Sequence, residues 1–375
     1  MKPERKSLPC GMIEPAAATT AASLLQPRQV FRSDTRWGRS VIEWPSLDAF
    51  LVTAEVQSGV HSVPIGEFAG KQINYDFLIT ARPGTVLLCH FHGNAPRDGI
   101  VLPIITGLGV TSSIATSMFV PSDPVLTLDA SLTLAWHFGC EGIHLQAITV
   151  SIVKKLRTIL HAPRVVAWGG SGGGFAAIRI VKDVPNAIAL VWNPQTNIAK
   201  YNKSHVTRYL QTAFPTIAGN SSLPSNREQF PSLCTDEFLD SYQGRILYLQ
   251  ERTDGHVVAH LKPFLASFCR KAPCNITDSS NFSGFATDQL YLHLVHWGNG
   301  HVPPSKDVIA KILRLLSDVT TNLENLENLK CFPDEVIENS AVNVSQPASA
   351  KKISGEIGTD RPGSFSKNDP SLDLK

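Results

Sequence analysis

The chain has 375 residues, of which 43% are hydrophobic and 18% are charged, with 34 basic and 32 acidic side chains. A formal net charge of +2 gives no general electrostatic reason to bind nucleic acid or an anionic membrane, because both require a concentrated basic surface. The ordinary hydrophobic content disfavours a wholly disordered protein, and the chain is long enough to bury a substantial core.

The cysteines and the N-terminal segment bear on the cellular compartment. The seven cysteines are scattered without a C-x-x-C pair, so they predict no zinc or redox site and favour a reducing compartment. An Ala-rich stretch follows the basic N-terminus, but Pro9, Glu14 and Pro15 interrupt it, which disfavours a signal peptide. No window has the roughly 18 consecutive apolar residues of a membrane span. We therefore expect a cytoplasmic protein.

Short apolar runs rich in β-branched residues alternate along the chain with longer segments of helical periodicity. This alternation predicts a mostly parallel sheet with helices on both faces, in which ligands bind at the carboxyl ends of the strands. In chain order, we predict strands at 73–80, 85–91, 164–168, 187–192, 245–250 and 289–296, and helices at 148–160, 175–182, 257–269 and 305–316.

The strongest chemical motif is a G-x-S-x-G sequence at Gly169, Ser171 and Gly173, between a predicted buried strand and a predicted helix. A sharp strand-to-helix turn crowds the positions two before and two after its central residue, so only small residues fit there. The turn would expose Ser171 Oγ above the sheet, near the positive end of the following helix. We interpret Ser171 as a candidate nucleophile.

Glycine-rich loops also occur in plain tight turns and in nucleotide-binding sites. A Walker A loop is disfavoured because no Lys-Ser or Lys-Thr pair follows the glycines. A dinucleotide fingerprint can be placed on Gly172, Gly174 and Ala177, but the next strand leads into Asn193 without an acidic residue for a ribose. The context of strand and helix favours the nucleophile.

With this turn in place, the chain resembles an α/β-hydrolase, a family with a nucleophile elbow followed in chain order by an acid and a histidine. The resemblance extends from about residue 73 to residue 316. It implies Asp254 as the acid, after the strand at 245–250, and His301 as the base, in a Gly-flanked loop before the last helix. Asp254 could instead only cap the following helix.

Other acids and histidines lie near the two predicted partners. Glu251 and Asp236 are the alternative acids, and His293 and His296 are the alternative histidines, although these two histidines fall within or at the end of a strand pattern.

The segment His90-Phe91-His92-Gly93-Asn94 ends an early predicted strand. In the family that this chain resembles, a His-Gly pair here opens the loop that supplies one amide of the oxyanion hole. The resemblance implies the backbone of Asn94 (or Gly93) and of Gly172 as the two donors. A metal site on His90 and His92 is disfavoured because no Asp-His pair follows.

Three further segments are similar to motifs of a bacterial α/β-hydrolase branch associated with surface-polysaccharide and glycosyltransferase gene products. They are Asp123-Pro124, Trp136-His137-Phe138-Gly139 and Asn193-Pro194-Gln195-Thr196. Since the turn at 193–195 follows a central strand, Asn193, Gln195 and also His92 are candidate lining residues of a substrate pocket. The same turn could simply close a loop.

These features predict a serine hydrolase that cleaves a carboxylic ester or related acyl compound of a small molecule or saccharide through an acyl-enzyme, with no cofactor and no metal. Two alternatives stay open. One is an acyltransferase that uses the same triad on a sugar or polysaccharide hydroxyl, and the other is a non-catalytic interaction protein on a hydrolase fold.

The composition also predicts domain boundaries. Residues 1–35 read as an irregular extension and residues 36–317 as one α/β-hydrolase domain, with possible cap elements at 100–149. Residues 318–375 are rich in Asn, Glu, Ser, Lys and Pro and read as a disordered tail.

Overall fold

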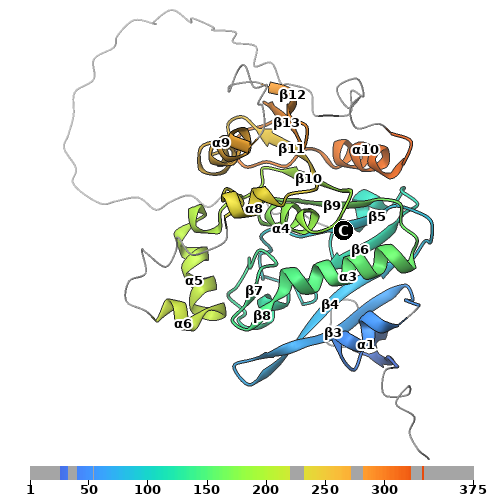
Figure 1. The fold of residues 1–375 in the computed structure, drawn as a ribbon. Helices are drawn as coiled ribbons and strands as arrows, with labels where there is room; N and C mark the ends of the chain where they lie inside the picture. The colour runs from blue at the N-terminus through green and yellow to red at the C-terminus, as the bar shows by residue number, and fades with distance from the viewer. Residues whose placement is uncertain are drawn as a thin grey trace, which may run out of the picture. The chain divides into compact units, whose positions relative to one another are not determined.

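A computed structural model describes residues 26–32, 40–53, 55–219, 232–271, 282–321 and Phe332 (Figure 1). All of them belong to one compact unit, Met1–Val336, while a second unit, Ile337–Lys375, lies outside the described residues. The predictions for most of the N-terminal extension and for nearly all of the tail therefore fall outside the described part of the chain.

The described residues form a sheet of eleven strands in the order β1-β2-β3-β4-β6-β5-β9-β10-β11-β13-β12. The six adjacent strands β6, β5, β9, β10, β11 and β13 run parallel to one another. The pairs β3·β4, β4·β6 and β12·β13 are antiparallel. The sheet strands are β1 (Arg28–Phe31), β2 (Ser40–Glu43), β3 (Gly59–Phe68), β4 (Lys71–Thr80), β5 (Leu87–His90), β6 (Ser117–Pro121), β9 (Val165–Gly170), β10 (Ala187–Trp192), β11 (Arg245–Glu251), β12 (Phe282–Thr287) and β13 (Leu290–Val295).

Helices and short turns connect these strands, and a two-stranded ribbon of β7 (Gly139–Cys140) and β8 (Ile143–His144) lies apart from the sheet. The helical elements are α1 (Leu47–Val52), α2 (Leu108–Thr111), η2 (Pro124–Thr127), α3 (Leu145–Ile159), α4 (Ser171–Lys182), η3 (Ile198–Lys200), α5 (Lys203–Ala213), α6 (Pro215–Ala218), α8 (Asp236–Asp240), the π-helical η5 (Val257–Leu261), α9 (Lys262–Lys271) and α10 (Lys306–Ser317).

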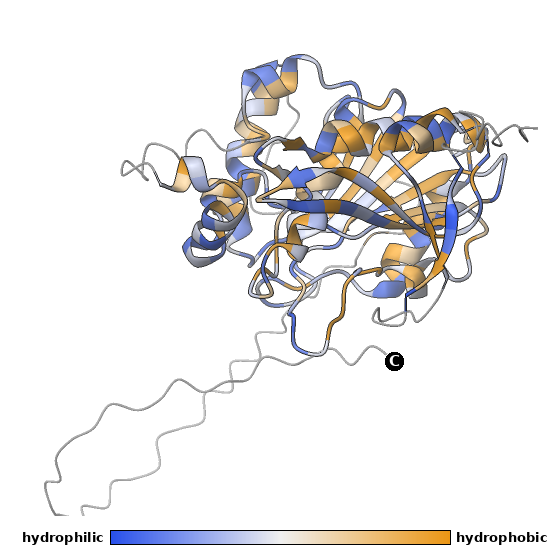
Figure 2. Cartoon of the chain, turned by 90° about the horizontal axis from the view of Figure 1, so that it is seen from below, coloured by the Kyte–Doolittle hydropathy of each residue, from blue (hydrophilic) through white to orange (hydrophobic). Residues whose placement is uncertain are grey.

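Alternate residues of the central strands pack on opposite faces of the sheet. In β9, Val165 and Ala167 join the core under α3, α4 and α9, whereas Val166 and Trp168 join the core under α10. The interior strands are accordingly mostly apolar in Figure 2. Because both faces are covered, these strands read as continuous hydrophobic runs in the sequence. The predicted α/β architecture with helices on both faces is confirmed.

The sequence predicted the central strands and the helices α3, α4, α9 and α10 closely, but it missed the helices α5, α6 and α8 and the strands β1, β2, β3, β6 and β12. The β6 strand lies within 100–149, where a cap was expected, and it is instead an interior strand between β4 and β5. Its five residues are too few for periodicity to separate a strand from a loop.

Two further observations differ from the sequence predictions. Arg28–Phe31 falls within the segment predicted to be irregular, yet it pairs with β2 as the edge strand β1. Cys269 of α9 is disulfide-bonded, although the cysteine spacing favoured a reducing compartment, and disulfides are typical of oxidising compartments. Cys89, Cys140 and Cys234 are free.

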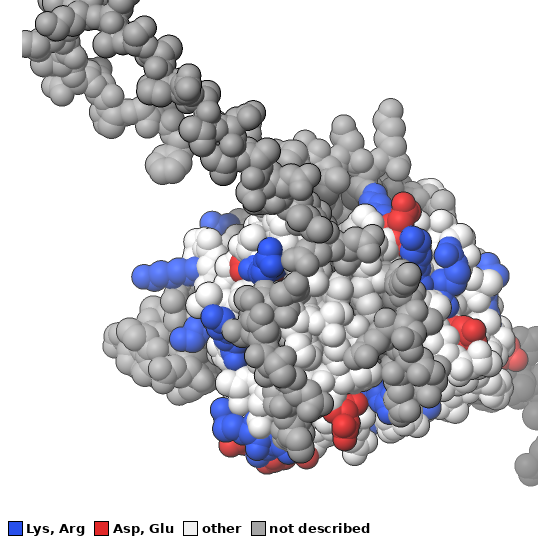
Figure 3. All heavy atoms as spheres, turned by 90° about the horizontal axis from the view of Figure 1, so that it is seen from above, with Lys and Arg blue, Asp and Glu red and all other residues white. Residues whose placement is uncertain are grey.

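Charge and hydropathy of the described surface agree with the composition. On the face in Figure 3, blue and red groups are interspersed among uncharged residues. Within the described ranges, no helix combines the length and the apolar character needed to cross a bilayer.

Candidate active site

Ser171 occupies the sharp turn between β9 and α4. Its backbone has a φ of +52°, a left-handed conformation that is uncommon for a residue other than glycine. A Cβ atom added at Gly169 or Gly173 would lie only 2.5 or 2.1 Å from the carbonyl oxygen of Phe91. The two glycines are therefore required because the chain after β5 passes directly against the turn.

The backbone around Ser171 offers donors for a negative charge. Gly172 is the second residue of α4, so its N–H has no partner within the helix and lies at the positive end of the helix dipole. Gly93 lies against this turn, since a Cβ added there would be 3.7 Å from Ser171 Cβ and 3.8 Å from Gly172 N. The loop of Gly93 and Asn94 thus borders the nucleophile candidate, and Asn94 itself is exposed.

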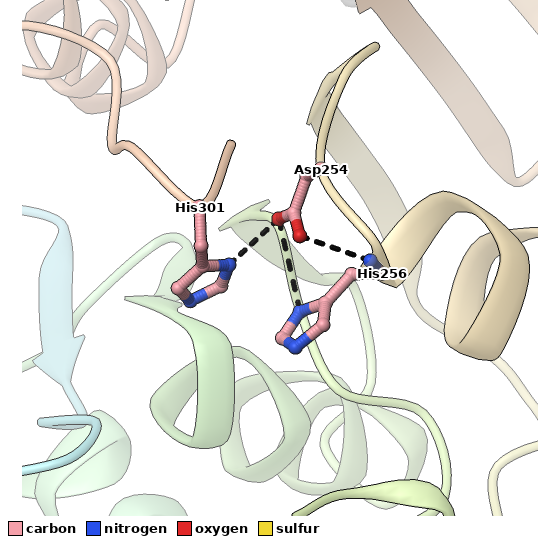
Figure 4. Close-up of side chains that lie close together, drawn as sticks. All are labelled: Asp254, His256 and His301. Atoms are coloured by element: carbon pink, nitrogen blue, oxygen red, sulfur yellow. Dashed lines mark hydrogen bonds and ion pairs between the residues drawn. The ribbon is translucent and has the colours of Figure 1, made fainter. Parts of the chain in front are cut away.

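The loops after β11 and β13 bring Asp254 and His301 together (Figure 4). His301 Nδ1 lies 2.6 Å from Asp254 Oδ2, and the side chains are 45% and 3% exposed, respectively. Since a carboxylate only accepts, Nδ1–H donates and the lone pair of the neutral ring lies on Nε2. Burial alone would raise the pKa of Asp254, but hydrogen bonds from the His301 ring and from the His256 N–H outweigh burial and lower it.

His256 is a second histidine in this cluster, and the sequence analysis gave it no role. Its ring centroid lies 4.3 Å from that of His301, and its Nδ1 donates to the Asn193 carbonyl oxygen at 2.9 Å. Burial and the neighbouring His301 lower the pKa of His256, so it remains neutral beside the pair. Its position two residues after Asp254 was the one signal in the sequence that could have found it.

Ser171 Oγ accepts a hydrogen bond from Gln195 Nε2 at 3.0 Å. Among the described residues, no hydrogen bond joins Ser171 Oγ to His301. Catalytic hydrogen bonds are often long in the absence of substrate and tighten when it binds. The structure therefore presents an assembled acid–histidine pair and a nucleophile candidate whose oxygen is held by an amide.

The alternative acids and histidines have other partners. Glu251 is fully buried, and it accepts from His296 Nδ1 at 2.8 Å and from the backbone N–H groups of Trp297 and Gly298. It thereby fixes the start of the loop that carries His301. The side chain of Asp236 is 62% exposed and pairs with Arg270, while His293 hydrogen-bonds Ser283 within the sheet.

Asn193 and His92, predicted to line a pocket, are both buried and fully engaged. Asn193 accepts from the Glu251 N–H at 2.8 Å and donates to the Val302 carbonyl at 2.7 Å, so it joins the acid and histidine loops. His92 Nδ1 donates to the Gly93 carbonyl, and its Nε2 accepts from the Asp123 N–H. His92 therefore holds the loop of Gly93 and Asn94 against Asp123, and burial lowers its pKa to about 4.

The described residues include one cluster with the donor atoms of a metal site, formed by Asp254, His256 and His301. One atom from each residue lies within 4.8 Å of the others. Two imidazoles and a carboxylate suit a zinc ion. A metal bound here would occupy the acid–histidine pair.

No protein-family model and no curated protein matches the sequence. Solved structures are similar to this chain only at low identity and with TM-scores below 0.5. A glycosylation-associated protein complex (Gap123) from Streptococcus agalactiae has a TM-score of 0.47 and 11% identity over 68% of this chain, which spans 47% of that one. The capsule O-acetyltransferase of Neisseria meningitidis serogroup A has a TM-score of 0.44 and 15% identity, covering 63% of this chain and 90% of that one.

A third similar structure is carboxyl esterase 2 from the fungus Tuber melanosporum, with a TM-score of 0.45 and 11% identity over 72% of this chain and 90% of that one. The fold is identified from the architecture of the chain itself. Its parallel strands β9, β10, β11 and β13 are adjacent in the sheet, the first turns sharply into α4 at Ser171, and the loops after β11 and β13 carry Asp254 and His301. This chain has the α/β-hydrolase fold.

Proposed function

We propose that the protein is a serine hydrolase that cleaves a carboxylic ester or related acyl compound through an acyl-enzyme. The observation that carries the proposal is the hydrogen bond of 2.6 Å between His301 Nδ1 and Asp254 Oδ2, on loops at the same end of the sheet as the strained turn of Ser171. A buried carboxylate that fixes the imidazole tautomer is the arrangement required for general base catalysis.

In the proposed mechanism, Ser171 Oγ attacks the acyl carbon while its proton moves to His301 Nε2. The carbonyl oxygen becomes an oxyanion, which the backbone N–H groups of Gly172 and Asn94 (or Gly93) stabilise. Each such donor is typically worth about 3 kcal/mol in the transition state. The bond between the acyl carbon and the alcohol oxygen then breaks as His301 protonates the leaving alcohol. In the second half, water attacks the acyl-enzyme while His301 takes its proton, and the bond between the acyl carbon and Ser171 Oγ breaks as His301 returns the proton to Oγ and the acid leaves.

A fluorophosphonate probe tests this proposal directly, because it reacts only with an activated serine. We expect labelling of Ser171 in the wild type, located by peptide mass spectrometry, and none in Ser171→Ala. Labelling should also fall strongly in His301→Ala. A folded wild type that stays unlabelled, and that hydrolyses no ester in a panel of p-nitrophenyl esters of graded chain length, would support the non-catalytic alternative.

Hydrolysis and acyl transfer share every step up to the acyl-enzyme, so they differ only in what attacks it. The two are separated by measuring product partition with and without an added saccharide acceptor. Hydrolysis predicts that the yield of free acid is unchanged by the acceptor, whereas acyl transfer predicts an acylated saccharide formed at its expense.

A further inference from the structure

Ser171 Oγ accepts a hydrogen bond from a side chain to which the proposed mechanism gives no role. Gln195 lies after β10, is fully buried, and donates from Nε2 to Ser171 Oγ at 3.0 Å. Its backbone N–H also donates to the Ser171 carbonyl oxygen at 3.1 Å. Residue 195 therefore holds both the side chain and the backbone of the nucleophile candidate.

The indole of Trp136 determines which end of the Gln195 amide faces Ser171. Trp136 Nε1–H donates to Gln195 Oε1, and an indole N–H can only donate. The amide oxygen must therefore face Trp136, which leaves the NH₂ group toward Ser171. Because both partners are buried, a flipped amide would place Nε2–H against the indole N–H and leave buried donors unpaired.

The loop that presents Trp136 is strained. Trp136 and the next residue, His137, have φ values of +57° and +49°, which are outliers for bulky side chains. Such strain persists where the surrounding contacts enforce it, and it concentrates at functional sites. Here the Trp136 ring is fully buried against Tyr201 and Tyr209, and a Cβ added to Gly172 would lie 3.3 Å from it.

We propose that Gln195 is a catalytic residue whose Nε2–H stabilises negative charge on Ser171 Oγ, and that Trp136 is the positioning residue that aims it. This inference rests on the proposed function. Negative charge gathers on Oγ as its proton leaves for His301 Nε2, and again when the bond between the acyl carbon and Oγ breaks in deacylation. The amide gives up no proton, so it acts only as a donor to the charged oxygen.

The first test replaces Gln195 with glutamate, which keeps the shape and removes the donor. Near neutral pH, the ionised carboxylate would repel the charge on Oγ, and we expect fluorophosphonate labelling and kcat to fall roughly 10- to 100-fold with little change in KM. On acidification the carboxyl gains a hydrogen that it can donate. The ratio of the Gln195→Glu rate to the wild-type rate should therefore rise as the pH falls, which a merely structural role would not produce.

The second test removes only the group that orients the amide. Trp136→Phe keeps an aromatic ring and deletes the indole N–H, so the amide can flip and present Oε1 to Ser171 Oγ. We expect kcat and labelling to fall roughly 3- to 10-fold with KM little changed. Trp44→Phe is the matched control, since Trp44 is also buried and its Nε1 donates to His61 Nδ1 at 2.9 Å, in a part of the core built around β2 and β3. It should lose stability and keep the wild-type labelling rate.

The outcomes separate this inference from the proposed function. If the folded wild type is not labelled, the proposed function fails and the inference with it. If the wild type is labelled and folded Gln195→Glu and Trp136→Phe are labelled at the same rate, the serine hydrolase stands and the role of Gln195 is overturned. Thermal unfolding identifies which variants are folded. If Gln195→Glu does not fold, the labelling rate of Trp136→Phe alone tests the role of Gln195.

Discussion

His301 Nδ1 lies 2.6 Å from Asp254 Oδ2, although the two residues are 47 positions apart in the chain. The parallel strands β11 and β13 are hydrogen-bonded neighbours, so the loops at their carboxyl ends meet at one edge of the sheet. Glu251 fixes one side of this arrangement by binding the backbone of the loop after β13. The pair is therefore set by the sheet, and its chemistry can be tested residue by residue.

Asp254→Asn should reduce kcat about 10³- to 10⁴-fold, since an amide facing His301 Nδ1 favours the wrong tautomer of the ring. Steady-state hydrolysis of an activated ester measures the loss. Asp236→Asn makes the same chemical change at a side chain that is 62% exposed on α8, and it should leave the rate unaltered. Equal rates for Asp254→Asn and wild type would remove Asp254 from the mechanism.

Gly173→Ala should destabilise the turn at Ser171, because the added Cβ would lie 2.1 Å from the Phe91 carbonyl oxygen. We expect a loss of about 1–3 kcal/mol in the free energy of unfolding, together with slower labelling of Ser171. Gly109→Ala is the control, since a Cβ at that position on α2 meets nothing within 4 Å. A Gly173→Ala protein as stable and as reactive as Gly109→Ala would mean that the turn has more room than the structure shows.

The buried histidines should make the fold sensitive to mild acid. Burial lowers the pKa of His61 and of His92 to about 4, and that of His90, His137 and His260 to about 3. These pKa values are below the unfolded value of about 6.5. At a pH between the folded and the unfolded pKa of a histidine, the unfolded chain therefore binds more protons than the folded chain does. The stability contributed by the neutral rings is complete above about pH 6.5 and is lost as the pH falls toward 4.

Urea unfolding between pH 7.5 and pH 4.5 measures this dependence. Each histidine contributes a slope of up to about 1.4 kcal/mol per pH unit. Burial raises the pKa values of Asp76 and Asp123, so these carboxyls change the pH dependence of stability in the direction opposite to the histidines. The difference in slope between the wild type and a histidine variant is therefore more informative than the slope of the wild type alone. His61→Gln should have a shallower slope than the wild type, and superimposable pH profiles would contradict the assignment.

Zinc should inhibit the enzyme, because Asp254, His256 and His301 place three suitable donors within 4.8 Å of one another. We expect micromolar to millimolar Zn²⁺ to slow labelling of Ser171 and EDTA to restore it. His256→Gln removes one imidazole ligand, so its labelling, expressed relative to its own rate without metal, should be less sensitive to Zn²⁺. Identical inhibition curves for His256→Gln and wild type would show that zinc acts elsewhere.

Local patterns determined the elements that carry the chemistry. The apolar runs at β9, β10, β11 and β13 are buried on both faces, so their hydrophobicity is nearly continuous and easily recognised. Gly169 and Gly173 are recognisable in the sequence because the turn at Ser171 leaves no room for a larger side chain at these positions. The resemblance to the α/β-hydrolases likewise placed Asp254 and His301 in loops that follow strands, although it did not show that the two strands are neighbours.

Only the tertiary structure decided what surrounds Ser171. Trp136 and Gln195 are 59 positions apart in the chain, and no periodicity links them, yet one hydrogen bond between them orients the amide that contacts Ser171 Oγ. The pairing of His296 with Glu251 and the hydrogen bond between the Asp123 N–H and His92 arise in the same way. Sequence specifies local backbone geometry through sterics and burial, whereas the partner of each buried polar group depends on which loops the sheet brings together.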